Sequence, residues 1–172
     1  EKEKLVGVRP LVYLASKLAF LSMLVFIQSI WMAIFVQSIC KLPLETFFPH
    51  IILLLLVNGA MTAICLGISS MAKTADQASL LSIYLVGFQL PLSGAVLALP
   101  DWAGWMTRPF ISAYWSWAGS MDGMERNYLR WIKEVTDTWL APMWLCMIVL
   151  VIHVAIGIFI AYVGVKRPRW EH

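Results

Sequence analysis

The sequence predicts an all-α integral membrane protein with four transmembrane helices. Of its 172 residues, 60% are hydrophobic and 13% are charged, and the mean hydropathy is +0.77. A soluble domain has about 45–50% apolar and about 25% charged residues, so a single core could not bury this much apolar surface. The alternation typical of barrel strands is absent. Helices are therefore expected, because they satisfy their own backbone hydrogen bonds in lipid.

Four apolar runs are long enough to cross a bilayer, which takes about 20 residues as a helix. They cover residues 18–40, 47–71, 78–99 and 139–165. Before them, residues 1–17 mix charged and apolar side chains and are expected to approach along the membrane surface. Residues 166–172 form a tail. Because the chain begins with Glu1 and not with Met, we expect a fragment or a processed product, with all four spans in one transmembrane domain.

The distribution of positive charge predicts the orientation of these spans. Lysine and arginine occur in the leading segment, at the turn after the second span and in the tail. Basic residues favour the cytoplasmic side, so both termini are expected there. The segment 100–138 would lie outside. It carries four basic and five acidic residues and gives no inside signal of its own.

The stretch "FQLPLSGAVLALPDWAGW", residues 88–105, interrupts the third predicted span. Pro91, Ser93 and Gly94 lie within an apolar run that Pro100 then ends, and seven of the nine tryptophans follow between residues 102 and 144. Tryptophan prefers the boundary between membrane and water. We therefore expect a re-entrant or interfacial helical segment before the last span, followed by a loop. A short amphipathic helix is plausible at 124–135.

Small residues recur every four positions in two of the spans. Gly59, Ala63 and Gly67 share one face of the second span, and Gly157 and Ala161 share a face of the last. Small side chains let membrane helices approach closely, so these faces are predicted to pack against other helices.

No Asp, Glu, Lys or Arg lies deep in any predicted span, which argues against an ion-coupled transporter or a voltage sensor. A lone His153 is expected to be a hydrogen-bonded packing residue. The three cysteines form no C-x-x-C pair, so neither a disulfide framework nor a metal site is predicted. Hydrolase, zinc-protease and P-loop motifs are absent, and no catalytic residue is assigned. A net charge of +3 without a basic run gives no indication of a nucleic-acid partner.

The order of features resembles a known family. "EKEKLVGVRPLVYLASK" carries an acidic/basic start, a glycine and a Tyr-x-x-Ser-Lys pattern at residues 13–17, and "LSGAVLALPDW" carries a Ser-Gly pair followed by proline. Together with the segment before the last span, they resemble the C-terminal two-thirds of the membrane domain of G-subfamily ABC transporters, the White and pleiotropic-drug-resistance type. The external segment lacks the cysteines of many animal members, which favours a prokaryotic or simpler relative.

The resemblance implies that the span at 78–99 lines a substrate cavity at a dimer interface. Two residues after the Ser-Gly pair form a leucine plug in well-known members, whereas this chain has the smaller Ala95 and Val96. The candidate pathway residues are Gly87, Gln89, Leu90, Ser93, Gly94, Ala95, Val96 and the intramembrane Asn58. The residues expected to couple the membrane domain to an ATPase are Glu3, Lys17, Lys73 and Asp76.

The implied function is that of the transmembrane part of an ATP-driven exporter for lipid-like or amphipathic substrates. ATP and magnesium would bind to a separate nucleotide-binding domain, upstream in cis or on a partner in trans, so this chain is not an enzyme by itself. Its partners would be that domain, a second permease half and membrane lipids. A prokaryotic relative would lie in the inner membrane.

Two other classes stay open. The chain could be a small four-span scaffold that binds partners through its glycine and alanine faces. It could also be an intramembrane enzyme acting on lipid, with His153, Asp101, Asp122 or Glu125 as acid/base groups. The second of these needs ionisable groups that converge at one depth, and no spacing in the sequence ensures this.

Overall fold

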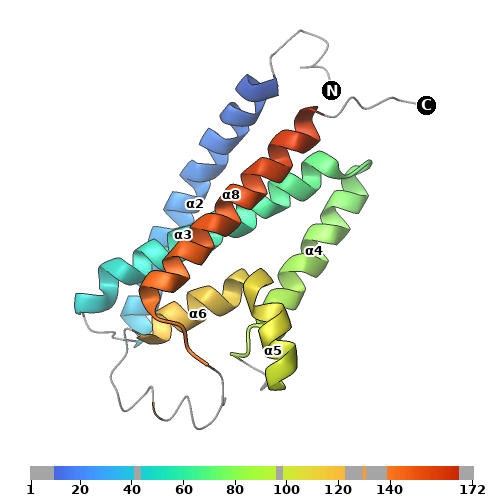
Figure 1. Cartoon of the computed structure of the whole chain (residues 1–172). Coiled ribbons are helices and arrows are strands. Elements are labelled where there is room, and N and C mark those ends of the chain that lie inside the picture. Colours follow the sequence, from blue (N-terminus) through green and yellow to red (C-terminus); the bar gives the residue numbers. More distant parts are fainter. Residues whose placement is uncertain (1–9, 41–43, 96–98, 123–129, 131–138, 167–172) are drawn as a thin grey trace.

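The computed structural model describes residues 10–40, 44–95, 99–122, 130 and 139–166. Within these residues all the regular elements are helices. The three longest are α2 (Pro10–Cys40), α3 (Leu44–Met71) and α8 (Met143–Lys166). Helix α3 packs against both of the others, and α4 (Ala75–Leu92) returns beside it after a short turn (Figure 1).

Three of these helices are long and apolar enough to cross a membrane: Leu11–Ile39, Phe47–Met71 and Met143–Lys166. Together with the helical fold, they support the prediction of an integral membrane protein. The predicted span at 78–99 is not among them. Helix α4 begins earlier, next to the charged Asp76, and ends at Leu92. At 18 residues it is about 27 Å long, slightly less than the hydrocarbon core of about 30 Å.

The backbone after α4 explains its early end. Pro91 lies in the last turn, and the Ser93 hydroxyl donates to the carbonyl of Leu90 at 2.7 Å. Gly94 then has φ 75°. This left-handed conformation is easy for glycine and costly for other residues, so the chain leaves the helix here. Continuing the apolar run as one helix to residue 99 was therefore wrong at its C-terminal end.

The other three long helices also differ from the predicted bounds, and α3 begins at Leu44 instead of residue 47. Helix α2 begins at Pro10, inside the segment expected to be a separate approach, because proline suits the first turn and the next residues continue the apolar pattern. Helix α8 begins after Pro142 and includes Lys166, which was assigned to the tail. The N–H of Met143 donates to the Asp122 carboxylate at 2.8 Å. A side chain from outside α8 thus accepts a hydrogen bond from a backbone N–H in the first turn that has no partner within the helix.

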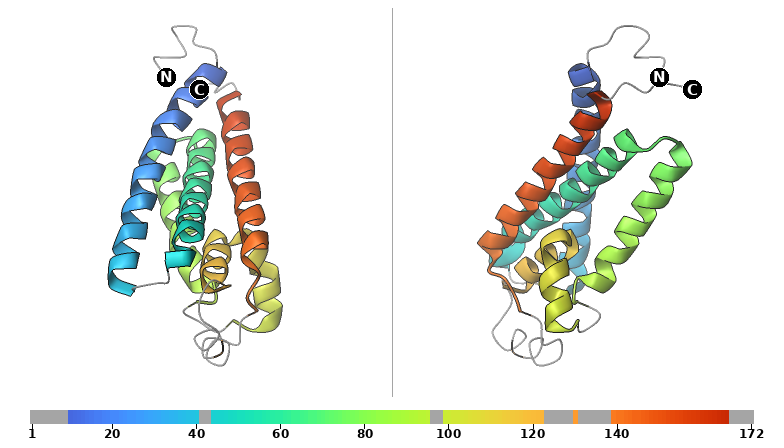
Figure 2. Two further views of the ribbon diagram at one scale, coloured as in Figure 1. Left: turned by 90° about the vertical axis from the view of Figure 1, so that its left-hand side faces the viewer. Right: turned by 45° about the vertical axis from the view of Figure 1, so that its right-hand side comes forward.

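Both views in Figure 2 place the first turn of α2, the last turn of α8 and the α3–α4 turn at one end of the bundle. The opposite end carries α5 (Asp101–Thr107), the 3-10 turn η1 (Arg108–Phe110) and α6 (Ser112–Asp122). The described residues at the start of the region expected to hold a re-entrant segment and a loop thus form α5, the 3-10 turn η1 and α6. The amphipathic helix expected at 124–135 lies outside the described residues, apart from Arg130.

The main buried cluster lies where α6 meets α3 and α8. Tyr114 is fully buried and donates its hydroxyl to the carbonyl of Trp139 at 2.6 Å. Burial raises the pKa of Tyr114 to about 12, although the nearby Arg108 charge lowers it. The phenol therefore stays protonated at neutral pH and remains a donor. Around it, the cluster contains Leu53, Ile111, Trp115, Ala118, Ala141, Cys146 and Leu150.

Candidate functional site

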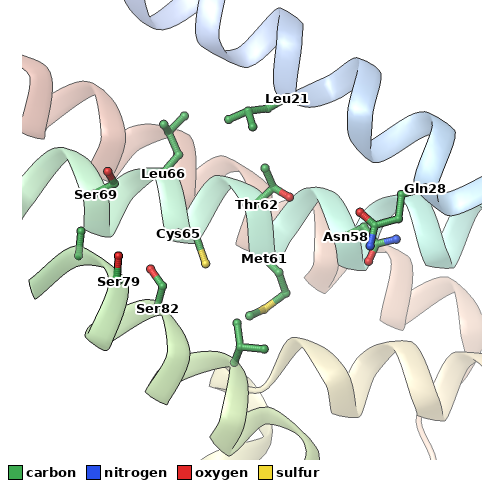
Figure 3. A pocket seen from close by; sticks show the side chains of 12 residues that line it. Leu21, Gln28, Asn58, Met61, Thr62, Cys65, Leu66, Ser69, Ser79 and Ser82 are labelled. Atoms are coloured by element: carbon green, nitrogen blue, oxygen red, sulfur yellow. The ribbon is translucent and has the colours of Figure 1, made fainter. Parts of the chain in front are cut away.

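A groove with a polar lining lies between α2, α3 and α4 (Figure 3). Its volume is about 570 Å³. The three helices diverge here because α4 leaves the short turn at residues 72–74 at an angle to α3, as Figure 2 shows. The groove is lined by Leu21, Gln28, Asn58, Met61, Thr62, Cys65, Leu66, Ser69, Ala78, Ser79, Ser82 and Val86.

Helix α3 supplies the central wall of this groove. Its residues Asn58, Thr62, Cys65 and Ser69 follow one another at intervals of four, three and four, which places them on one face of a helix. A membrane helix that contacted lipid on this side would carry aliphatic side chains. This face instead carries amide, hydroxyl and thiol groups.

The adjacent face of α3 is the small-residue face, and it packs against α8. A Cβ added at Gly157 would lie 2.6 Å from the carbonyl carbon of Ala63, and one added at Gly67 would lie 3.1 Å from the carbonyl oxygen of Gly157. A Cβ at Gly164 would lie 2.8 Å from that of Ser70. Gly59 lies farther away, and Ala161 is fully buried. The two faces predicted to pack thus meet each other.

Several groove hydroxyls have unused hydrogen-bonding capacity. Elsewhere in the bundle, serines bond to a carbonyl of their own helix: Ser22 to Ala19, Ser38 to Ile34 and Ser120 to Ser116, each at 2.8 Å. Five groove side chains make no such bond, nor any other hydrogen bond to the described part of the chain. They are Gln28, Thr62, Ser69, Ser79 and Ser82.

Asn58 is the one candidate pathway residue that lines the groove. Its amide nitrogen donates to the hydroxyl of Ser29 at 2.9 Å, and Ser29 is fully buried between α2 and α3. This bond fixes the orientation of the amide. Figure 3 shows Asn58 next to Gln28 at one end of the groove.

The candidates at the end of α4 lie apart from the groove, and they do not share one surface. Gln89 is buried and accepts a hydrogen bond from the backbone N–H of Ala113 at 3.1 Å, so it holds α4 to the start of α6. Ser93 is almost fully buried. Gly87 and Leu90 are exposed on the other side of the helix. Helical rotation thus separates the exposed Gly87 and Leu90 from the buried Gln89 and Ser93, and their role in a pathway stays a prediction.

Two of the remaining pathway candidates follow the left-handed turn at Gly94. The backbone N–H of Ala95 donates to the Ser93 hydroxyl at 3.2 Å, and Ala95 is partly buried. Val96 lies outside the described residues. Whether the pair gates a pathway stays a prediction.

A second groove provides a contrast. It lies between α2, α3 and α8, has a volume of about 710 Å³ and is lined almost entirely by aliphatic and aromatic side chains such as Leu18, Phe26, Leu55 and Ile158. Such a lining is typical of contact with lipid chains. The polar lining of the first groove is therefore a local property and is not shared by every gap in the bundle.

The candidate coupling residues lie at the end of the bundle that carries the α3–α4 turn. Lys17, Lys73 and Asp76 are exposed. Lys17 lies over the ring of Tyr13 on the same helix, with 5.7 Å between the ammonium nitrogen and the ring centroid. Glu3 is outside the described residues.

His153 is held on both sides by the protein. Its Nε2 lies 2.8 Å from the carbonyl oxygen of Pro109, which can only accept, so Nε2 donates. Its Nδ1 lies 3.1 Å from the Ser112 hydroxyl. The ring thus connects α8 with the start of α6. Among the described residues, no group of three or more His, Cys, Asp or Glu residues is placed to hold a metal.

The sequence-based search missed most of the groove. It named Asn58 but not Gln28, Thr62, Ser69, Ser79 or Ser82, because single hydroxyls in membrane helices are common and were given no weight. A signal was present: polar residues at 58, 62, 65 and 69 follow the helical period beside the small-residue period at 59, 63 and 67.

One comparison with known proteins identifies the family of the chain. The family model of the ABC-2 type transporter membrane domain matches residues 1–115, more than half of the chain, and the match includes every residue of the polar groove. The protein belongs to the ABC-2 type transporter family. It is a transmembrane component of an ABC transporter, and such domains usually partner with nucleotide-binding domains. A comparison with curated protein sequences gave no match.

Proposed function

We propose that the chain forms part of the translocation pathway of an ATP-driven exporter of the G-subfamily type, with lipid-like or amphipathic substrates. The observation that carries this proposal is the polar groove inside the segment that matches the ABC-2 family. A pathway for amphipathic molecules needs a mostly apolar wall with a few groups that orient polar atoms. The lining of Leu21, Met61, Leu66 and Val86 together with hydroxyls and amides has this character.

ATP hydrolysis would take place on a nucleotide-binding domain, in cis or in trans, with magnesium bound there. That domain would press on the end of the bundle where Lys17, Lys73 and Asp76 are exposed, which is the cytoplasmic end in this proposal. Helix α3 ends and α4 begins at this end of the bundle. Movement of the turn between them would therefore change the width of the groove. A second permease half would complete the pathway, and a prokaryotic version would lie in the inner membrane.

The opposite end would face outward, with α5 and α6 as the re-entrant or interfacial segment. Trp102, Trp105 and Met106 are 72%, 74% and 70% exposed, and they follow one another on one side of α5. Large exposed aromatic groups at the end of a membrane bundle are suited to the headgroup region. In this proposal α5 rests in the outer interface and α6 closes the bundle beneath it.

The scaffold alternative loses its main support. It requires glycine and alanine faces that are open to partners, but Ala63, Gly67 and Gly157 are already packed within the chain. The described residues also give little support to the lipid-enzyme alternative. Two of its candidate acid/base groups, His153 and the Asp122 carboxylate, already make hydrogen bonds within the protein. The Asp101 side chain and Glu125 lie outside the described residues.

Export can be tested in inside-out vesicles that contain the intact transporter. We expect ATP to drive uptake of a fluorescent amphipathic probe, and we expect a non-hydrolysable ATP analogue to drive none. A control transporter whose nucleotide-binding domain has its P-loop lysine replaced should also be inactive. Equal accumulation of the probe with ATP, with the analogue and with the P-loop variant would contradict the proposal.

A further inference from the structure

We propose that the groove between α2, α3 and α4 binds an uncharged amphipathic molecule with hydrogen-bonding groups at both of its ends. The inference rests on the proposed export function and specifies its substrate class and binding place. It moves the substrate contacts away from the end of α4, where residues 87–96 were expected to form them.

The lining excludes a charged ligand. None of the described residues that line the groove is Asp, Glu, Lys, Arg or His. An ion moved from water into such a place would lose its hydration and find no opposite charge, which is strongly unfavourable. Hydroxyl, amide and carbonyl groups would instead find neutral donors and acceptors.

The polar groups gather at two ends, as Figure 3 shows. Gln28 and Asn58 lie at one end, and Ser69, Ser79 and Ser82 lie at the other. Asn58 and Ser69 are separated by eleven positions on the same helix, which corresponds to about 16 Å. Figure 3 shows Leu21 and Met61 between the ends, together with the Thr62 hydroxyl and the Cys65 thiol. A complementary molecule is polar at each end and mostly apolar between them.

The unused hydrogen-bonding capacity also favours a ligand over simple lipid filling. Acyl chains would leave the free hydroxyl and amide groups of the groove without partners, at a cost for each group. The second groove is far more apolar: besides Thr62, which lines both grooves, its one other hydroxyl among the lining residues is that of Ser22, and this is turned back to Ala19. The volume of about 570 Å³ is within the range of small-molecule sites, about 300–1,000 Å³.

The test uses the intact transporter in lipid nanodiscs and two dansyl probes of the same length. Dansylaminoundecanoic acid is anionic at neutral pH, whereas its primary amide is neutral, with a sulfonamide at one end and a carboxamide at the other. We expect the amide to bind at least about tenfold more tightly than the acid, because only the acid buries a charge.

Two variants examine the two ends of the groove. Gln28→Leu and Ser82→Ala should each weaken binding of the amide by about fivefold, the effect of one lost hydrogen bond. Ser22→Ala is the matched control, because this serine is on α2 but lines the apolar groove and already bonds to its own helix. Equal affinities for acid and amide would overturn the inference, and so would unchanged binding in both groove variants.

Cys65 provides an independent readout, because its free thiol lines the groove. The neutral amide should slow alkylation of Cys65 by N-ethylmaleimide, with Cys65→Ser as the blank for other thiols. A thiol that does not react even without the probe would show that water and small molecules do not reach the groove in the intact transporter, and would overturn the inference.

The two proposals fail in different ways. Protection of Cys65 together with tighter binding of the amide, but without ATP-driven movement, would support the binding site and contradict export. ATP-driven movement of the amide without protection of Cys65 would support export and contradict this binding site.

Discussion

Ala63 of α3 lies directly against the backbone of Gly157 of α8. A Cβ at position 157 would come within 2.8 Å of the Ala63 Cβ and 2.7 Å of the backbone nitrogen of Ile64. The obstacle is backbone, which cannot rotate away. The contact therefore sets how closely the two helices approach, and α3 is the helix whose neighbouring face forms the groove.

Gly157→Ala is expected to destabilise the bundle by about 1–3 kcal/mol, because the added methyl group forces α3 and α8 apart. Thermal unfolding of the purified protein, followed by tryptophan fluorescence, measures the change. Gly87→Ala is the matched control, since beyond its chain neighbours and the backbone of its own helix no heavy atom of the described residues lies within 4 Å of a Cβ there. It should leave stability unchanged or slightly raised. Equal unfolding temperatures for the two variants would contradict the conclusion that the contact between Ala63 and Gly157 sets the approach of α3 and α8.

Ser82→Phe should block transport by filling the groove, while Ile83→Phe should not. The two residues are adjacent on α4, but Ser82 lines the groove and Ile83 is 66% exposed on another side of the helix. The comparison controls for the added volume and for membrane insertion. Initial rates of ATP-dependent uptake in vesicles, corrected for the amount of inserted protein, give the result. Similar rates for the two variants would argue against passage through this groove.

His153→Phe should lower the free energy of unfolding by about 1–3 kcal/mol, because the Pro109 carbonyl and the Ser112 hydroxyl lose their partner in a buried place. Combining it with Ser112→Ala in a double-mutant cycle should give less than the sum of the two effects. Ser120→Ala serves as a control, since that hydroxyl bonds to a carbonyl of its own helix. Strict additivity of His153→Phe and Ser112→Ala would mean that the contact between these two side chains contributes no energy.

Gly94→Ala should cost about 1–2 kcal/mol, because an L side chain is strained at the left-handed φ of 75°. Thermal unfolding measures this cost directly. The larger Gly94→Leu would reduce export for the same structural reason, even where the residue touches no substrate. Loss of export in this variant therefore cannot distinguish a pathway residue from a turn residue, whereas the pair Ser82→Phe and Ile83→Phe can. Unchanged stability in Gly94→Ala would show that the turn tolerates a side chain.

The helical membrane architecture followed from local properties of the sequence. Long apolar runs can satisfy their backbone groups in lipid only as helices, so α2, α3 and α8 could be expected from hydropathy alone. The end of α4 could not be placed in the same way, because hydropathy averages over Pro91, Ser93 and Gly94. The turn there depends on a hydroxyl-to-carbonyl bond and a single positive φ.

Small-residue spacing indicated that α3 and α8 each had a packing face, since that pattern is periodic along one helix. The sequence did not say that Ala63 would meet Gly157, because pairing depends on the relative position of two helices separated by α4 and α6. The family resemblance assigned residues 87–96 to a substrate pathway, but it did not say which neighbour each side chain would face. In the structure the helical rotation of α4 turns Gln89 toward α6 and leaves Leu90 exposed.

By itself the sequence determined a membrane-embedded helical protein, its small-residue faces and the absence of charge from the depth of its spans. Each of these follows from hydropathy, helical spacing or the positions of charged residues, which are local properties of the sequence. Only the tertiary structure decided which faces meet and where space remains. The small residues of α3 bring α8 close, α4 diverges after its short turn, and Thr62, Ser69 and Ser82 are left facing an open groove. That arrangement arises from contacts between distant segments, which no local pattern encodes.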